Sequence, residues 1–164
     1  MTRRRLFQMV LGAGAVGAGA RFAGAQDRGS KTAATAFEVA MAEADWKKRL
    51  TPAQFAVLRK HGTERAGSSP LDKEYSRGVY HCAGCDLALF SSDTKFDSGT
   101  GWPSFWAPLQ SAVGTTTDRS LFMVRTEVHC RRCGGHLGHV FDDGPKPTGL
   151  RYCMNGVALT FRRA

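Results

Sequence analysis

The chain has 164 residues, is 42% hydrophobic and carries a formal net charge of +9. A chain of this length forms one ordinary domain, which buries about two-thirds of the surface exposed by the unfolded chain. Its first 25 residues hold four arginines and no acidic residue, so the charge falls to +5 without them. The remaining positive charge is spread along the chain, which argues against a nucleic-acid-binding patch.

The first 25 residues have the layout of an export signal. Consecutive arginines at positions 3–5 precede a Gly/Ala-rich run at 9–20, and Ala23-Gly24-Ala25 provides a small-x-small cleavage site. The arginines favour the twin-arginine route, so we expect cleavage after Ala25, a periplasmic location and contact with the membrane only during export. An uncut membrane anchor is the alternative, but the run is short for a span and Arg21 interrupts its end.

Residues 26–43 are rich in Ala, Thr and Lys and lack turn signals, so they are interpreted as a linker before a domain at 44–164. A short helical turn is expected at 45–50. A second helix should follow, because Thr51 can cap it and Gln54 completes a capping box around Pro52. The pair His61-Gly62 should end this helix, with the glycine as the left-handed residue.

Beyond Gly78 the pattern changes to short runs of β-branched and aromatic residues separated by Gly, Asp and Ser. Such runs are typical of strands. A mainly β fold of antiparallel strands with a small helical N-terminal segment is therefore expected. The predicted strands are 79–82, 88–91, 111–116, 121–129, 139–142 and 154–162.

Two C-x-x-C motifs predict a closed metal site. Each motif lies in a tight turn after a predicted strand, and four thiolates complete a tetrahedral zinc site with no open position, which makes the zinc structural. Two disulfides, or one redox-active C-x-x-C, are the alternatives. The predicted ligands are Cys82, Cys85, Cys130 and Cys133.

The fifth cysteine, Cys153, has no partner and is therefore a candidate nucleophile. A thiol attacks as its thiolate, and Arg151 and Asn155 lie two residues away on either side, on the same face of a regular strand. The structural alternative is that Cys153 is a small core residue, as buried cysteines usually are.

Two further segments offer polar and aromatic groups for a site. His136 and His139 follow the second C-x-x-C directly, and Gly99–Phe105 presents Trp102 and Phe105 on a rigid turn. Each has a structural alternative, because a histidine pair is often a satisfied structural pair and a tryptophan is often a core residue.

Three long motifs resemble the B-type methionine sulfoxide reductases, which reduce the R epimer of methionine sulfoxide. They are Phe96–Phe105, Gly135–Pro145 and Gly149–Asn155, and the likeness covers residues 44–163. Long motifs in the same order make a chance match improbable. The resemblance implies two packed antiparallel sheets with short helices at the N-terminus.

The resemblance also implies roles for single residues. Cys153 matches the family nucleophile, and Trp102 matches the hydrophobic wall for the S-methyl group of the substrate. We add Phe105, from the same turn, to the predicted substrate-binding residues. The roles implied for the remaining residues are donors around the sulfoxide oxygen for His136, His139 and Asn155, stabilisation of the thiolate for Arg151, and structural zinc ligands for Cys82, Cys85, Cys130 and Cys133.

The predicted reaction begins with attack of the thiolate on the sulfoxide sulfur and leaves Cys153 as a sulfenic acid. The imidazoles titrate in the range needed to protonate the departing oxygen. Many relatives carry a resolving cysteine where this chain has Thr100. We therefore expect an external reductant, either a thioredoxin-like partner or a small thiol, and free or protein-bound methionine sulfoxide as substrate. Some relatives also have a histidine where Leu121 stands, which reduces the expected donor set.

A non-catalytic zinc ribbon that binds protein or nucleic acid is the rival hypothesis. Arg131 and Arg132 at the tip of one C-x-x-C turn favour it, while the unpaired Cys153 and the export signal oppose it. A zinc hydrolase is a weaker third possibility, because four cysteine ligands leave no coordination position for water.

Overall fold

A computed structural model describes residues 37–120 and 123–164. The predicted signal at 1–25 and the linker up to residue 36 lie outside the described residues. The last part of the predicted linker is attached to the domain, since the N–H of Val39 donates to the carbonyl of Arg132 at 3.0 Å.

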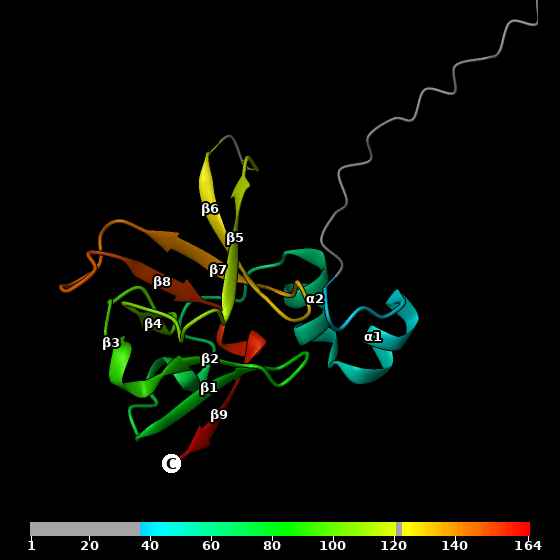
Figure 1. The fold of residues 1–164 in the computed structure, drawn as a ribbon, viewed down its shortest axis with the longest axis horizontal. Helices are drawn as coiled ribbons and strands as arrows, with labels where there is room; N and C mark the ends of the chain where they lie inside the picture. The colour runs from blue at the N-terminus through cyan, green and yellow to red at the C-terminus, as the bar shows by residue number, and fades with distance from the viewer. Residues whose placement is uncertain (1–36, 121–122) are drawn as a thin grey trace, which may run out of the picture. The chain divides into compact units, whose positions relative to one another are not determined.

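Two short helices precede the strands, as predicted (Figure 1). They are α1, Glu43–Arg49, and α2, Pro52–Lys60. The capping box of α2 is present, because Gln54 N–H donates to Thr51 Oγ1 at 3.2 Å and Thr51 N–H donates to Gln54 Oε1 at 3.0 Å. Among the described residues, no helix has the length and apolar character needed to cross a membrane.

The end of α2 corrects one prediction. The left-handed residue is His61, with φ 55°, and not Gly62. Gly62 serves a different purpose, because a Cβ at this position would lie only 2.9 Å from the carbonyl oxygen of Ala56. The chain therefore needs glycine here for close approach to the helix, and the side chain of His61 is left at the helix terminus.

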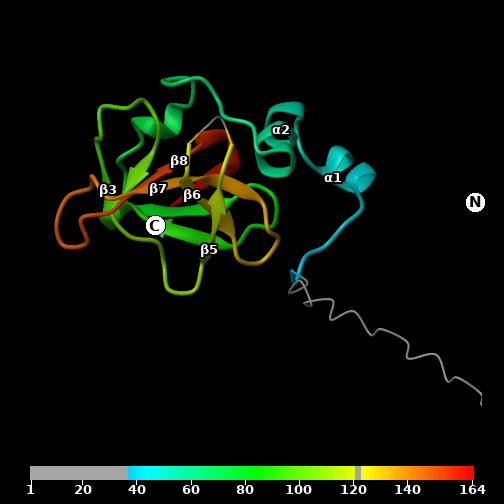
Figure 2. The ribbon, with the colours of Figure 1, turned by 90° about the horizontal axis from the view of Figure 1, so that it is seen from above.

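The strands form two antiparallel sheets, which confirms the predicted mainly β class. Figure 2 shows the same strands from above, with α1 and α2 to one side. The smaller sheet has the order β2-β1-β9, with β2 at Ala88–Ser91, β1 at Gly78–Cys82 and β9 at Leu159–Arg163. The larger has the order β3-β4-β8-β7-β6-β5, with bounds Lys95–Phe96, Ser104–Phe105, Arg151–Met154, His136–Phe141, Arg125–Cys130 and Val113–Asp118.

Several strand bounds differ from the predicted ones. Strand β5 is Val113–Asp118 where 111–116 was predicted, β7 is His136–Phe141 where 139–142 was predicted, and β8 begins at Arg151, before the predicted run 154–162. Three further differences are larger. The run 154–162 is not one strand, because the 3₁₀ turn Gly156–Ala158 divides β8 from β9 and carries the chain from the larger sheet to the smaller. The two-residue strands β3 and β4 were not predicted. The run predicted at 121–129 pairs only from Arg125 onward, and residues 121–122 lie outside the described residues.

An aromatic cluster joins the two sheets. Phe105 of β4 stacks on Phe90 of β2 with ring centroids 4.4 Å apart, and it meets the edge of Tyr80 of β1 at 4.9 Å. All three side chains are fully buried. Burying such a side chain contributes about 1.5–3 kcal/mol, so the cluster fixes β4 against the smaller sheet. This matters for function because β4 pairs with β8, which carries Cys153.

Candidate functional site

Cys153 lies on β8, between two strands that hold it from either side. In the register of the sheet, its partners are Ser104 of β4 and His139 of β7. The hydroxyl of Thr100 lies close to the thiol, with its Oγ1 4.0 Å from the Cys153 sulfur. The thiol is partly exposed and forms no disulfide. It is therefore fixed in position but reachable.

A small pocket of about 130 Å³ opens over this thiol and brings together several of the predicted site residues. Its walls are largely apolar, with a few polar groups, as in most small-molecule sites. A larger cavity of about 690 Å³ lies beside α2 and contains none of the predicted site residues, so we assign the chemistry to the small pocket. The residues around the small pocket are Thr63, Trp102, Arg125, Gly138, His139, Phe141, Cys153 and Asn155.

Asn155 lines the pocket, but its amide group is held by the backbone. Its Nδ2 donates to the carbonyl of Leu137 at 3.0 Å, and its Oδ1 accepts from the N–H of Glu64 at 2.9 Å. The side chain is buried. Asn155 therefore fixes the end of β8 against β7, and it lines the pocket in which the sequence predicts a donor to the sulfoxide oxygen.

Phe105 does not reach the pocket. It belongs to the aromatic cluster of the core and is fully buried. Trp102, from the same turn, faces the pocket. The buried position of Phe105 does not match its expected substrate-binding role. From this turn, Trp102 is the residue that lines the pocket.

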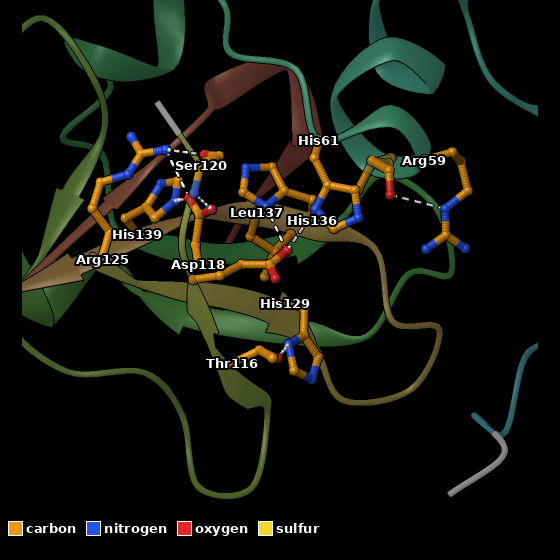
Figure 3. Close-up of polar contacts among 12 residues, drawn as sticks. Arg59, His61, Thr116, Asp118, Ser120, Arg125, His129, His136, Leu137 and His139 are labelled. Atoms are coloured by element: carbon orange, nitrogen blue, oxygen red, sulfur yellow. Dashed lines mark hydrogen bonds and ion pairs between the residues drawn. The ribbon is translucent and has the colours of Figure 1, made fainter. Parts of the chain in front are cut away.

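His139 is held by a carboxylate that the sequence did not single out. Its Nε2 lies 2.9 Å from Oδ2 of Asp118 on β5, and Arg125 of β6 donates to the same oxygen at 2.7 Å (Figure 3). A hydrogen bond from the N–H of Ser120, followed by that from His139, holds the pKa of Asp118 well below its usual range. The carboxylate is thus ionised, and it holds the imidazole of His139 in one orientation.

His136 lies three residues before His139, at the start of β7. Its side chain is 2% exposed, and its Nδ1 lies 2.7 Å from Oε1 of Glu127. Burial lowers the pKa of His136, which favours the neutral ring, and its Nε2 has no partner among the described residues. His136 lines a neighbouring cavity of about 520 Å³, which it shares with His139, and not the pocket over Cys153.

Arg151 and the thiol influence each other through charge. Arg151 binds Asp143 through two hydrogen bonds of 2.9 and 2.8 Å, and its guanidinium lies 4.4 Å from the ring of Phe141. Burial raises the pKa of Cys153, while the charge of Arg151 and hydrogen bonds from Thr100 and Arg151 lower it in part. Arg151 therefore favours the thiolate, and burial, which opposes it, has the larger effect.

The four remaining cysteines converge between the sheets. All are buried, and their sulfur atoms lie within 4.8 Å of one another. The distances are 3.7 Å between Cys82 and Cys133 and 3.5 Å between Cys85 and Cys130. Thiolates on a tetrahedral zinc ion, with Zn–S of about 2.3 Å, stand roughly 3.8 Å apart. The donor set therefore fits a four-thiolate metal ion and joins the β1–β2 turn to the β6–β7 turn.

Several residues at the site were missed by the sequence reasoning. Strand β6 carries Arg125 and Glu127 at alternate positions, so their side chains share one face of the sheet. Glu127 lies opposite His139 in the register. This alternation within the run 121–129 was the available signal, but the pairing with β5 and β7 was needed to show what the side chains contact. Asp118, Thr63 and Glu64 gave no such signal.

Comparison with known proteins agrees with this geometry. A family model described as the SelR domain matches residues 50–163. The peptide methionine sulfoxide reductase MsrB of Leptospira interrogans is 53% identical over 128 residues, which cover 77% of this chain and 98% of that protein. The protein of the same name from Methanosarcina barkeri is 58% identical over 125 residues, covering 76% of this chain and 88% of that protein.

A thiol, an indole and a carboxylate-held imidazole thus lie around one pocket of an antiparallel β domain. The chain belongs to the SelR-domain family of peptide methionine sulfoxide reductases, the MsrB proteins. It is therefore an enzyme that reduces methionine sulfoxide and repairs oxidative damage with electrons from a thiol reductant. A non-catalytic zinc ribbon does not account for this membership.

Proposed function

We propose that the Cys153 thiolate reduces the R epimer of methionine sulfoxide within the small pocket. The observation that supports this most directly is that Cys153, Trp102 and His139 line one pocket of about 130 Å³. In this proposal Trp102 contacts the S-methyl group while His139 gives a proton to the sulfoxide oxygen. Because the sulfoxide sulfur is chiral, only one epimer can place its methyl group on Trp102 and its oxygen beside His139 at the same time.

The electron balance requires one cysteine and two further thiols. The Cys153 sulfur attacks the sulfoxide sulfur, whose protonated oxygen leaves as water, so a sulfur–sulfur bond replaces the S–O bond. Water then attacks the Cys153 sulfur and breaks the sulfur–sulfur bond, so methionine leaves with two additional electrons and Cys153 becomes a sulfenic acid. A first external thiol then displaces water to form a mixed disulfide. A second thiol attacks that disulfide, releases the oxidised reductant and restores the Cys153 thiol. Because Thr100 stands near the thiol and the other cysteines form the four-thiolate cluster, the reductant is a small thiol or a thioredoxin-like protein.

The test is Cys153→Ser, assayed with each sulfoxide epimer separately and with a dithiol supplied. We expect loss of reduction of the R epimer, with thermal unfolding unchanged. In the unsubstituted protein, a sulfenic-acid trap applied without reductant should label Cys153 once per substrate reduced. Retained activity in the variant, or equal turnover of both epimers, would contradict the proposal.

We also propose that the four-cysteine cluster holds a structural Zn²⁺ ion. The ion would be bound by Cys82, Cys85, Cys130 and Cys133, and it would supply cross-linking of the two turns and no redox chemistry. Elemental analysis should find one zinc per chain. Folded, active protein that contains no metal would refute this assignment.

Export to the periplasm is a further proposal, supported by the arginines at positions 3–5 and the small-residue site ending at Ala25. Replacing Arg3, Arg4 and Arg5 by lysine keeps the charge but removes the twin-arginine signal. We expect this variant to remain in the cytoplasmic fraction, while the parent chain appears in the periplasm without its first 25 residues. Identical distribution of both chains would reject the route.

A further inference from the structure

We propose a second metal site, separate from the four-cysteine cluster, formed by His61, Glu127 and His136 and suited to a divalent transition-metal ion such as Zn²⁺. The ligating atoms of these residues lie within 4.8 Å of one another. Two imidazoles and one carboxylate are the ligand set of three-ligand zinc sites and of mononuclear iron sites. The site goes beyond the proposed function and does not depend on it.

The three side chains converge from three elements. His61 directly follows α2, and His136 begins β7 (Figure 3). Glu127 lies on β6. The Nδ1 atoms of both histidines face the same carboxylate oxygen, Oε1 of Glu127, at 3.0 Å for His61 and 2.7 Å for His136. Ligands at about 2.0–2.1 Å from a tetrahedral ion stand roughly 3.3 Å apart, so the atoms need to separate by only a few tenths of an ångström.

Two of the three ligands are buried and one is exposed, an arrangement that allows an ion to enter and leave. The side chain of His136 is 2% exposed and that of Glu127 is 12% exposed, so packing orders both before any ion arrives. The side chain of His61 is 64% exposed and can turn away to admit an ion. Without an ion, both imidazoles can hydrogen-bond the carboxylate, so the fold does not require the metal.

The site opens onto the cavity of about 520 Å³ that also contains His139. This space can hold water at the remaining coordination position, which distinguishes the site from the closed four-cysteine cluster. Of the other charged groups on the cavity wall, Asp118 is already paired with Arg125, and Arg119 is the remaining cation. The carboxylate of Glu127 contacts the two imidazoles and forms no ion pair with an arginine or lysine among the described residues, so its charge is available to a metal ion.

Occupation of the site has a consequence for the enzyme. An ion bound through Nδ1 of His136 replaces the hydrogen bond between His136 and Glu127 and fills part of the cavity beside His139. Excess Zn²⁺ should therefore slow the reductase by acting at these ligands, without displacing the ion of the cysteine cluster.

The experiment measures binding of metal to the full chain whose four-cysteine cluster is already loaded with zinc. Zn²⁺ is titrated by calorimetry, and Co²⁺ is used as a spectroscopic probe, because nitrogen and oxygen ligands give its d–d bands without thiolate charge-transfer absorption. We expect one further equivalent of each ion. His61→Asn keeps a residue that tolerates the left-handed conformation, and Glu127→Gln removes the charge at nearly constant shape.

Each of these variants should weaken binding of the second ion by at least about tenfold, since loss of even an outer-shell partner costs that much. The matched control is His81→Asn on β1, whose imidazole lies beside Asp86 in the smaller sheet. Thermal unfolding checks that His61→Asn is folded. The proposal is overturned if the parent chain takes up no second ion, or if His61→Asn and Glu127→Gln bind it as tightly as the parent.

Discussion

The indole N–H of Trp102 donates to the backbone carbonyl of Glu64 at 3.2 Å. Glu64 is joined to the other side of the site as well, because its N–H donates to Asn155 and its carboxylate accepts from the N–H of Val157 at 3.0 Å. The carboxylate also accepts from the N–H of Gly156. One residue between α2 and the strands thus fixes both the tryptophan and the chain that follows the thiol.

Glu64→Gln should therefore destabilise the fold and the site together. An amide has one acceptor oxygen where the carboxylate has two, so one backbone N–H loses its charge-assisted hydrogen bond. We expect a loss of about 1–3 kcal/mol in the free energy of unfolding, measured in urea, together with a lower kcat/KM. Glu38→Gln, at an exposed glutamate, is the control and should change neither quantity. Equal stability of both variants would show that Glu64 does not hold the site.

Arg151→Gln should move the titration of the thiol. Burial raises the pKa of Cys153, and the charge of Arg151 lowers it in part. Removal of the charge should therefore raise this pKa further. The thiolate forms as pH rises through this pKa. The midpoint of the rate of alkylation against pH should thus lie above the ordinary cysteine range in the parent and higher still in the variant. Arg162→Gln, at an exposed arginine paired with Asp86, should leave the midpoint unchanged.

Asp118→Asn should impair proton donation by His139. The carboxylate accepts from the His139 ring at 2.9 Å and orients it, whereas a neutral amide forms a weaker hydrogen bond and holds the ring less firmly. A positioned acid contributes about 10²–10⁴ to a rate, so we expect kcat to fall by roughly 10–100-fold with a smaller change in KM. Asp93→Asn, at an exposed aspartate outside the pocket, is the matched control. A proportional rise in KM alone would point to substrate binding instead.

Thr100→Cys should give the chain an internal route to a disulfide. Oγ1 of Thr100 lies 4.0 Å from the sulfur of Cys153, so a thiol at position 100 would stand beside the sulfenic acid formed in one turnover. We expect one exposure to substrate without reductant to remove two titratable thiols from the variant and one from the parent. Thr115→Cys, at an exposed position of β5, adds a thiol away from the site and should show only the parental loss.

Local patterns in the sequence sufficed for the features that depend on neighbouring residues. The capping box of Thr51 and Gln54 and the C-x-x-C turns are of this kind, and each is present in the structure. The residues alone marked Cys153, Trp102 and His139 as candidates, and the resemblance to a family supplied their roles; the three meet in one pocket.

The missed features depend on pairing between distant residues. Strand β4 is only two residues long and exists because Ser104 pairs with Cys153, which is far away in the sequence. The contact between His139 and Asp118 likewise requires three strands in register. Phe105 was assigned to the substrate because a turn does not reveal which of its aromatic side chains faces the core.

The strand that carries Cys153 is hydrogen-bonded to a neighbour on each edge, β4 on one and β7 on the other. The reacting sulfur is therefore stationary, apart from rotation about its own side-chain bond. In the proposed reaction, oxidised methionine and reductant must reach this sulfur in turn through the same pocket of about 130 Å³. A damaged protein would be repaired only where its own oxidised side chain stands clear of its surface.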